Sequence, residues 1–83
     1  MNSSLSEREK EVAILIAKGH TDVEIAQQLF ISRRRVGEII FTIKLKYHVS
    51  SRVTIGIVVY HLGWLNINEI IGEADYAEKS SLH

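Results

Sequence analysis

Three consecutive arginines, Arg33, Arg34 and Arg35, follow directly after Ser32. A serine is a good helix N-cap, and apolar residues at helical spacing come next, so the arginines are predicted to form the first turn of a helix. The positive end of a helix dipole disfavours each cation there by about 0.3–1 kcal/mol. A phosphate docked at this end would satisfy both the guanidinium groups and the free backbone N–H groups. The cluster therefore predicts a site for a phosphate-bearing ligand; the alternative is three solvated surface side chains.

The charge of the chain is unevenly distributed along its 83 residues, although the net charge is zero. Residues 1–31 carry a net charge of −2, residues 32–52 a net charge of +5, and residues 53–83 a net charge of −3. A balance of zero would by itself argue against a nucleic-acid-binding protein. The basic middle segment, however, has the charge pattern that such a protein requires.

Length and composition limit the classes of protein to which the chain can belong. Eighty-three residues make one small domain, with 46% apolar residues to build a core but no room for a deep active site, so no enzyme and no small-molecule substrate are expected. The absence of cysteine excludes disulfides and thiolate metal sites, and the four histidines lack metal-ligand spacing. We therefore expect no cofactor and no metal. Interrupted apolar runs predict no membrane segment, and a cytoplasmic location follows.

The elements that position the arginines are all predicted to be helices. Ser6 with Glu9, and Thr21 with Glu24, have the spacing of capping boxes, so helices are expected to begin after Ser6 and after Thr21. Gly19 is a good stop for the first of them. The apolar stripes of these two helices consist of Leu5, Val12, Leu15 and Ile16, and of Ile25, Ala26 and Leu29.

Two longer apolar patterns follow. The third helix is predicted at about 33–47, with Val36, Ile40, Ile43 and Tyr47 on one face. The fourth begins after Ser50 or Ser51 and carries the stripe Ile55, Val58, Val59 and Leu62, with Ile57 and Tyr60 off that stripe. Residues 1–65 are expected to form the domain, and 66–83 an acidic amphipathic extension with a frayed tail. In that extension Asn66 or Asn68 would cap a last segment containing Ile67, Ile70, Ile71 and Ala74.

The second and third predicted helices are separated only by about three residues, Phe30 to Ser32. Two helices joined by so short a turn form a helix-turn-helix. In that arrangement the second helix lies in the DNA major groove, with its N-terminal residues against base edges and phosphates. The position of the arginines thus has a functional explanation.

The chain resembles the LuxR/NarL/FixJ-type DNA-binding domain over residues 5 to about 65. That family shows L-[ST]-x-R-E, then G-x-[ST]-[ND]-x-E-I-A-x-x-L-x-[IVL]-S, then V, then I-x-x-K-[LM]-x-[VL]-x-x-R. The matching positions are Leu5, Ser6, Arg8 and Glu9; Gly19, Thr21, Asp22, Glu24, Ile25, Ala26, Leu29, Ile31 and Ser32; Val36; and Ile43, Lys46, Val49 and Arg52.

The resemblance implies an all-α, four-helix helix-turn-helix domain that regulates transcription and dimerises through its fourth helix. The chain would be the effector end of a response regulator or quorum-sensing receptor, or a freestanding protein similar to spore regulators. Its partners would be double-stranded DNA and a second copy of itself. The expected DNA-contacting residues are Thr21, Arg33, Arg34, Arg35, Glu38, Phe41, Thr42 and Lys46. The expected dimer interface consists of Ile55, Val58, Val59 and Leu62.

The start of the third helix departs from the family pattern. Arg35, Gly37 and Ile39 stand where the family usually has threonine, lysine and histidine. On the outward face, Glu38 can accept from the cytosine amino group and Phe41 can contact a thymine methyl. Phe41 and Leu45 also form an apolar pair that would suit a protein partner, so the alternative function is an interaction module or antagonist of another regulator. We also expect an ion pair between Arg52 and Glu9.

Overall fold

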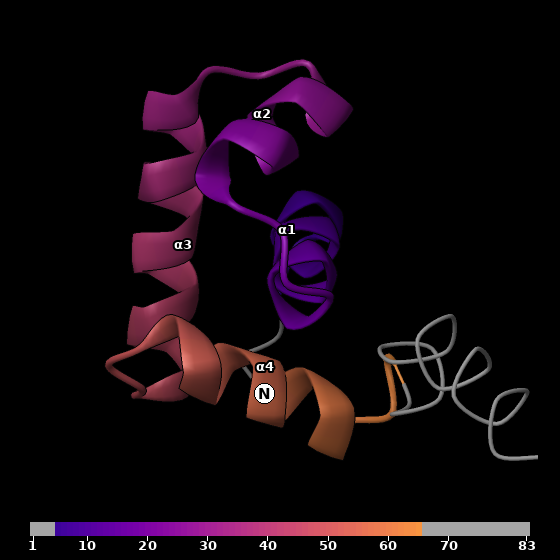
Figure 1. The fold of residues 1–83 in the computed structure, drawn as a ribbon. Coiled ribbons are helices and arrows are strands. Elements are labelled where there is room, and N and C mark those ends of the chain that lie inside the picture. Colours follow the sequence, from indigo (N-terminus) through magenta and orange to yellow (C-terminus); the bar gives the residue numbers. More distant parts are fainter. Residues whose placement is uncertain (1–4, 66–83) are drawn as a thin grey trace, which may run out of the picture.

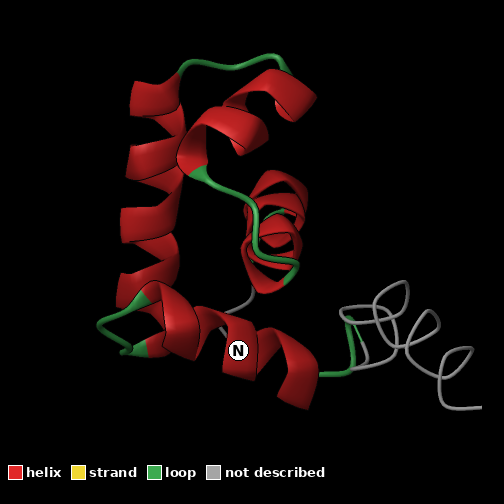
Figure 2. Cartoon of the chain, viewed as in Figure 1, coloured by secondary structure: helices red, strands yellow, loops and turns green. Residues whose placement is uncertain are grey.

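The computed structural model describes residues 5–65, which form four helices joined by short turns (Figure 2). The helices are α1 (Glu7–Ala17), α2 (Asp22–Leu29), α3 (Arg33–Tyr47) and α4 (Arg52–His61). The all-α, four-helix fold class is confirmed. The predicted C-terminal extension lies outside the described residues. Within residues 5–65, no helix has both the length and the hydropathy needed to cross a membrane.

Each of the four helices begins after a hydroxyl-bearing residue. The side-chain oxygen of that residue accepts a hydrogen bond from the backbone N–H three residues later, at 3.0–3.2 Å. Both predicted capping boxes are present, because the carboxylates of Glu9 and Glu24 accept from the backbone N–H of their own N-caps. The N-caps are Ser6, Thr21, Ser32 and Ser51, which resolves the choice between Ser50 and Ser51.

The helices end in two different ways. Gly19 and Gly63 follow α1 and α4 with positive φ angles of 93° and 80°, a conformation that glycine adopts without a steric penalty. Phe30 and His48 end α2 and α3 in the left-handed region, with φ angles of 57° and 56°. The three-residue turn before α3 therefore depends on one strained non-glycine residue, Phe30, whose side chain is 93% exposed.

The core lies between the four helices, and α1 packs against all three others. As viewed in Figure 1, α3 runs along one side, α4 crosses below α3 and α1, and α2 lies above α1. The predicted stripes supply most of the core, to which Ala13, Ile39 and Leu65 are additions. The buried residues are Val12, Ala13, Ile16, Ile25, Ala26, Val36, Ile39, Ile40, Ile43, Ile55, Val59 and Leu65.

Long polar side chains connect elements that are distant in sequence. The predicted pair between Arg52 and Glu9 is wrong. Arg52 instead donates to Asp22 Oδ1 and to the backbone carbonyl of His20, which joins the start of α4 to the start of α2. Glu9 pairs with Lys46, whose Nζ lies 2.7 Å from its Oε1, because the C-terminal part of α3 packs beside the start of α1.

Candidate nucleic-acid interface

The turn between α2 and α3 places the two helices in a helix-turn-helix arrangement. Only Phe30, Ile31 and Ser32 separate Leu29 from Arg33, and α2 and α3 pack against each other. The inner face of α3 is held by four buried aliphatic side chains, Val36, Ile39, Ile40 and Ile43. The opposite face of α3 is consequently free of the core and fixed in position.

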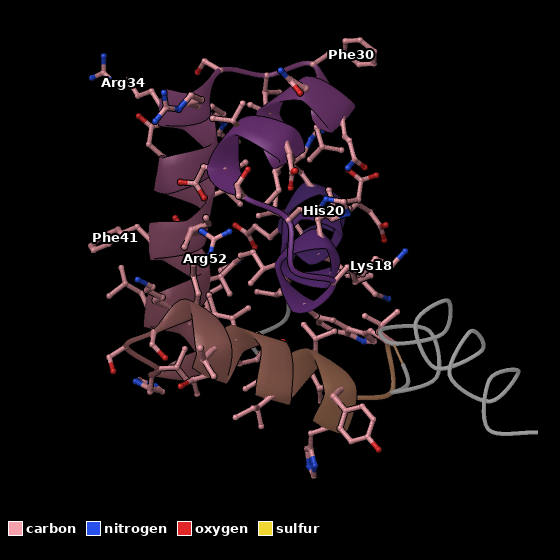
Figure 3. All side chains as sticks on the ribbon, in the orientation of Figure 1. Lys18, His20, Phe30, Arg34, Phe41 and Arg52 are labelled. Atoms are coloured by element: carbon pink, nitrogen blue, oxygen red, sulfur yellow. The ribbon has the colours of Figure 1, made fainter. Side chains whose placement is uncertain are left out.

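The outward face of α3 is a continuous exposed stripe, which we call the α3 stripe. Its members are Arg34, Glu38, Phe41 and Leu45, whose spacing of three or four residues places them on one side of the helix. Arg34 is 90% exposed and Phe41 is 62% exposed, and in Figure 3 both side chains point away from the other helices. Gly37 lies beside this stripe, and a Cβ added there would meet open space.

The three arginines lie at the N-terminal end of α3, as the sequence predicts. All three are exposed, and the first turn of α3 contains no acidic residue. The N-terminus of α3 therefore combines the positive end of the helix dipole with three guanidinium groups. Such an arrangement attracts an anion and does not stabilise the isolated helix.

Glu38, one turn further along α3, is paired with two of these arginines. Its Oε1 lies 3.3 Å from Arg35 Nη1, and its Oε2 lies 3.8 Å from Arg34 Nε. Its backbone carbonyl accepts a hydrogen bond from Thr42 Oγ1 at 3.1 Å. The pairing was missed in the sequence, although the spacings i,i+3 and i,i+4 are those at which helical side chains meet.

The remaining two candidate DNA contacts lie elsewhere in the domain. Thr21 is the exposed N-cap of α2. Lys46 lies near the other end of α3, and its ammonium is paired with Glu9, a carboxylate with only 16% of its side chain exposed. The hydrogen bond from Lys46 is the main reason why the pKa of Glu9 is lowered from its ordinary value of 4.5, while partial burial acts in the opposite direction. Lys46 thus has a clear role in joining α3 to α1.

The structure divides the four residues expected at the dimer interface. Ile55 and Val59 are buried in the core of the single chain, so placing them on a surface is wrong. Val58 is half-buried, and Leu62 is exposed. The apolar side chains that α4 exposes on one side are Val53, Ile57 and Tyr60, which we call the α4 face; Leu62, the C-cap of α4, is exposed beyond the end of the helix.

No group of three or more metal-ligating side chains comes together within residues 5–65. Of the positions that depart from the family pattern, Ile39 is buried in the inner face of α3, whereas Arg35 and Gly37 are exposed. The replacement of histidine by isoleucine therefore adds to the core. The replacement of lysine by glycine removes a cation from the outward side of α3.

The fold and the surface together define a helix-turn-helix domain. The second helix of the motif, α3, carries three arginines at its N-terminus. Residues 3–59 match the family model described as "Bacterial regulatory proteins, luxR family", which covers more than half of the chain. The chain belongs to this family, as its motifs indicate. No curated protein and no solved structure matches it. Membership indicates a DNA-binding regulator of transcription, a class defined by binding and not by catalysis.

Proposed function

We propose that the protein binds double-stranded DNA with α3 as its recognition helix and thereby regulates transcription. The observation that supports this most strongly is the cluster of three exposed arginines at the positive end of α3, directly after the turn of a luxR-family helix-turn-helix. Because these cations destabilise the isolated helix, a bound phosphate backbone accounts for them better than folding does. The protein would act in the cytoplasm, where bacterial DNA lies.

In this proposal the cationic end of α3 anchors the helix, and the α3 stripe faces the bases. Arg33, Arg34 and Arg35 contact phosphates or guanines at the edge of the major groove. Glu38, Phe41 and Thr42 lie one to two turns further on, where base edges are within reach of a recognition helix. Thr21 at the start of α2 and Lys46 near the end of α3 would contact the DNA backbone, Lys46 while it also pairs with Glu9.

A second copy of the chain would pair through the α4 face. Val53, Ile57 and Tyr60 expose apolar surface on one side of a short helix, which an isolated domain does not need for its core. Pairing there would relate two copies of α3 by two-fold symmetry. Two half-sites about one helical turn apart, roughly 34–36 Å, would then be read together.

The experiment is a titration of random duplex DNA at several salt concentrations. If the arginines neutralise phosphates, log K should fall linearly with log salt, with a slope of roughly −0.9 for each arginine that reaches a phosphate and thus at most roughly −2.7 from the three. Arg34→Ala should make the slope shallower, by at most roughly 0.9. Arg8→Ala on α1 removes the same charge from an exposed i,i+3 ion pair and should leave the slope unchanged. Absence of binding at low salt, or binding without a salt slope, would reject DNA binding.

A protein-interaction module is the second candidate, and one observation favours it. Phe41 and Leu45 expose 62% and 59% of their surface on the same side of α3, and both are large and apolar. A regulator that has lost DNA binding would use this pair against another protein. In that case Leu45→Glu would abolish complex formation with a partner, while Arg34→Ala would have no effect.

A further inference from the structure

We propose that Glu38 is a selectivity gate. Its carboxylate weakens binding to DNA of arbitrary sequence, and it accepts a hydrogen bond from a cytosine where the sequence places one opposite it. This inference rests on the proposed function. Its basis is the position of one carboxylate between two of the three arginines, within 3.3 Å of Arg35 and 3.8 Å of Arg34. Within α3, Glu38 is the only acidic residue, and the first turn of the helix contains none.

On DNA of any sequence, the phosphates and Glu38 compete for the same guanidinium groups. A phosphate can take Arg34 or Arg35 only if the ion pair to Glu38 opens or is shared. Opening leaves a carboxylate in the strongly negative groove without a counter-charge. Glu38 therefore subtracts from the sequence-independent part of binding, which is the part that the arginines supply.

The ion pairs are weak enough for the gate to open. The side chain of Glu38 is 54% exposed, and those of Arg34 and Arg35 are 90% and 58% exposed. Exposed pairs of this kind contribute little net stability because water solvates both partners. The arginines can thus exchange Glu38 for phosphate as soon as the carboxylate has another donor to bind.

The major groove offers such a donor at two bases, cytosine (N4) and adenine (N6), and adenine is the less favourable partner of a carboxylate because its acceptor N7 lies beside N6. Cytosine presents its N4 amino group there, and glutamate is the side chain that accepts from it, whereas guanine and thymine present acceptors that repel a carboxylate. A C·G pair opposite Glu38 would therefore give the carboxylate a hydrogen-bond donor. At the same time it would free Arg34 and Arg35 from their ion pairs, so that both can contact phosphates. Phe41 lies three residues further along the same stripe, about 4.5 Å along the helix axis, so a thymine methyl close to that cytosine would be favoured.

The test compares Glu38→Gln with Glu11→Gln. Glu11 is a matched control because it has the same side-chain exposure of 54% and an i,i+3 pair to an arginine, Arg8, at 3.6 Å, but lies on α1. Glu38→Gln should bind random duplex about three- to tenfold more tightly than wild type at 100 mM salt. Its salt slope should steepen by about 0.9–1.8, as one or two arginines reach phosphate. Glu11→Gln should behave like wild type.

A second measurement addresses the cytosine. Duplexes recovered from a randomised library by wild-type protein should be enriched for a C·G pair at one position, and those recovered by Glu38→Gln should lose that preference. Equal random-duplex affinities for Glu38→Gln and Glu11→Gln would overturn the gate while leaving the proposed function intact. An enriched position that Glu38→Gln leaves unchanged would also overturn it. Binding by none of the three proteins would overturn the proposed function, and the gate with it.

Discussion

Arg52 and Asp22 are thirty residues apart in sequence and share a hydrogen-bonded ion pair that joins two helix starts. The guanidinium of Arg52, the first residue of α4, donates to Asp22 Oδ1 and, at 2.7 Å, to the carbonyl of His20. Asp22 is the first residue of α2, the first helix of the helix-turn-helix, and His20 lies in the turn directly before the N-cap of that helix. In Figure 3 Arg52 points from α4 into the space between α4 and the other helices. The orientation of the DNA-binding motif thus depends on a side chain of the fourth helix.

Replacing Arg52 by methionine should destabilise the domain by about 1–2 kcal/mol, because two charge-assisted hydrogen bonds are lost at a half-exposed site. Urea unfolding measures the loss. Amide exchange should quicken at the start of α2 more than in the centre of α3. Arg52→Lys should recover less than half of the loss, since a lysine cannot present two donors in a fixed fork. Full recovery by lysine would show that charge alone matters there.

Glu9 and Lys46 form the second tie, and it predicts a loss of stability in acid. The pKa of Glu9 is lowered, first by the hydrogen bond from Lys46. A lowered folded-state pKa means that the pair contributes its full stability above the ordinary pKa of 4.5 and loses it as pH falls through the folded-state pKa. Glu9→Gln should therefore reduce the free energy of unfolding by about 1 kcal/mol at pH 7 and flatten its decline below about pH 4.5.

Glutamine suits this test because it can still accept from the backbone N–H of Ser6, as the capping box requires. Lys46→Met should flatten the same part of the pH profile, and the double variant should be no flatter than either single one. Urea unfolding at pH 7, 4.5 and 3 provides the curves. If the wild type and Lys46→Met lose stability equally between pH 4.5 and 3, the pair is not the cause.

The helix boundaries could be predicted from the sequence because the interactions that fix them are local. A hydroxyl oxygen and a backbone N–H three residues later need no distant partner, so Ser6, Thr21 and Ser32 are recognisable as caps. The same holds for most of the buried face of α3, where Val36, Ile40 and Ile43 recur at helical spacing and are buried as predicted, although the predicted stripe does not include Ile39.

The partners of long side chains could not be predicted in this way, because they depend on how helices cross. Arg52 and Lys46 both lie near acidic residues in several conceivable packings, and only the fold decides between Asp22 and Glu9. α4 presents a related difficulty, since it is apolar on more than one side. The sequence places Ile55 on the apolar stripe of α4 and Ile57 off it, but only the packing of α4 on α1 shows that the stripe residue Ile55 belongs to the core of the single chain and that Ile57 is exposed.

Gly37 lies inside α3, where glycine destabilises a helix by roughly 0.8–1 kcal/mol relative to alanine. A Cβ there would touch nothing within 4 Å, and no positive φ requires a glycine. Gly37→Ala should therefore raise the free energy of unfolding by about 0.5–1 kcal/mol, as measured in urea. If this more stable variant binds DNA less tightly than wild type, the glycine serves close approach to the groove. Unchanged DNA affinity would show that the position faces no ligand.

The α4 face predicts the effect of a charge on self-association. Ile57 is 61% exposed at the centre of that face, so Ile57→Glu should leave the fold intact and weaken a dimer by at least tenfold. Sedimentation equilibrium at several protein concentrations gives the dissociation constant. Val23→Glu places the same charge on an exposed apolar position of α2 and should leave the constant unchanged.

Val59→Glu, in contrast, should unfold the domain, because Val59 is buried in the core of the single chain. A dimer that persists unchanged in Ile57→Glu would show that the two copies pair through another surface.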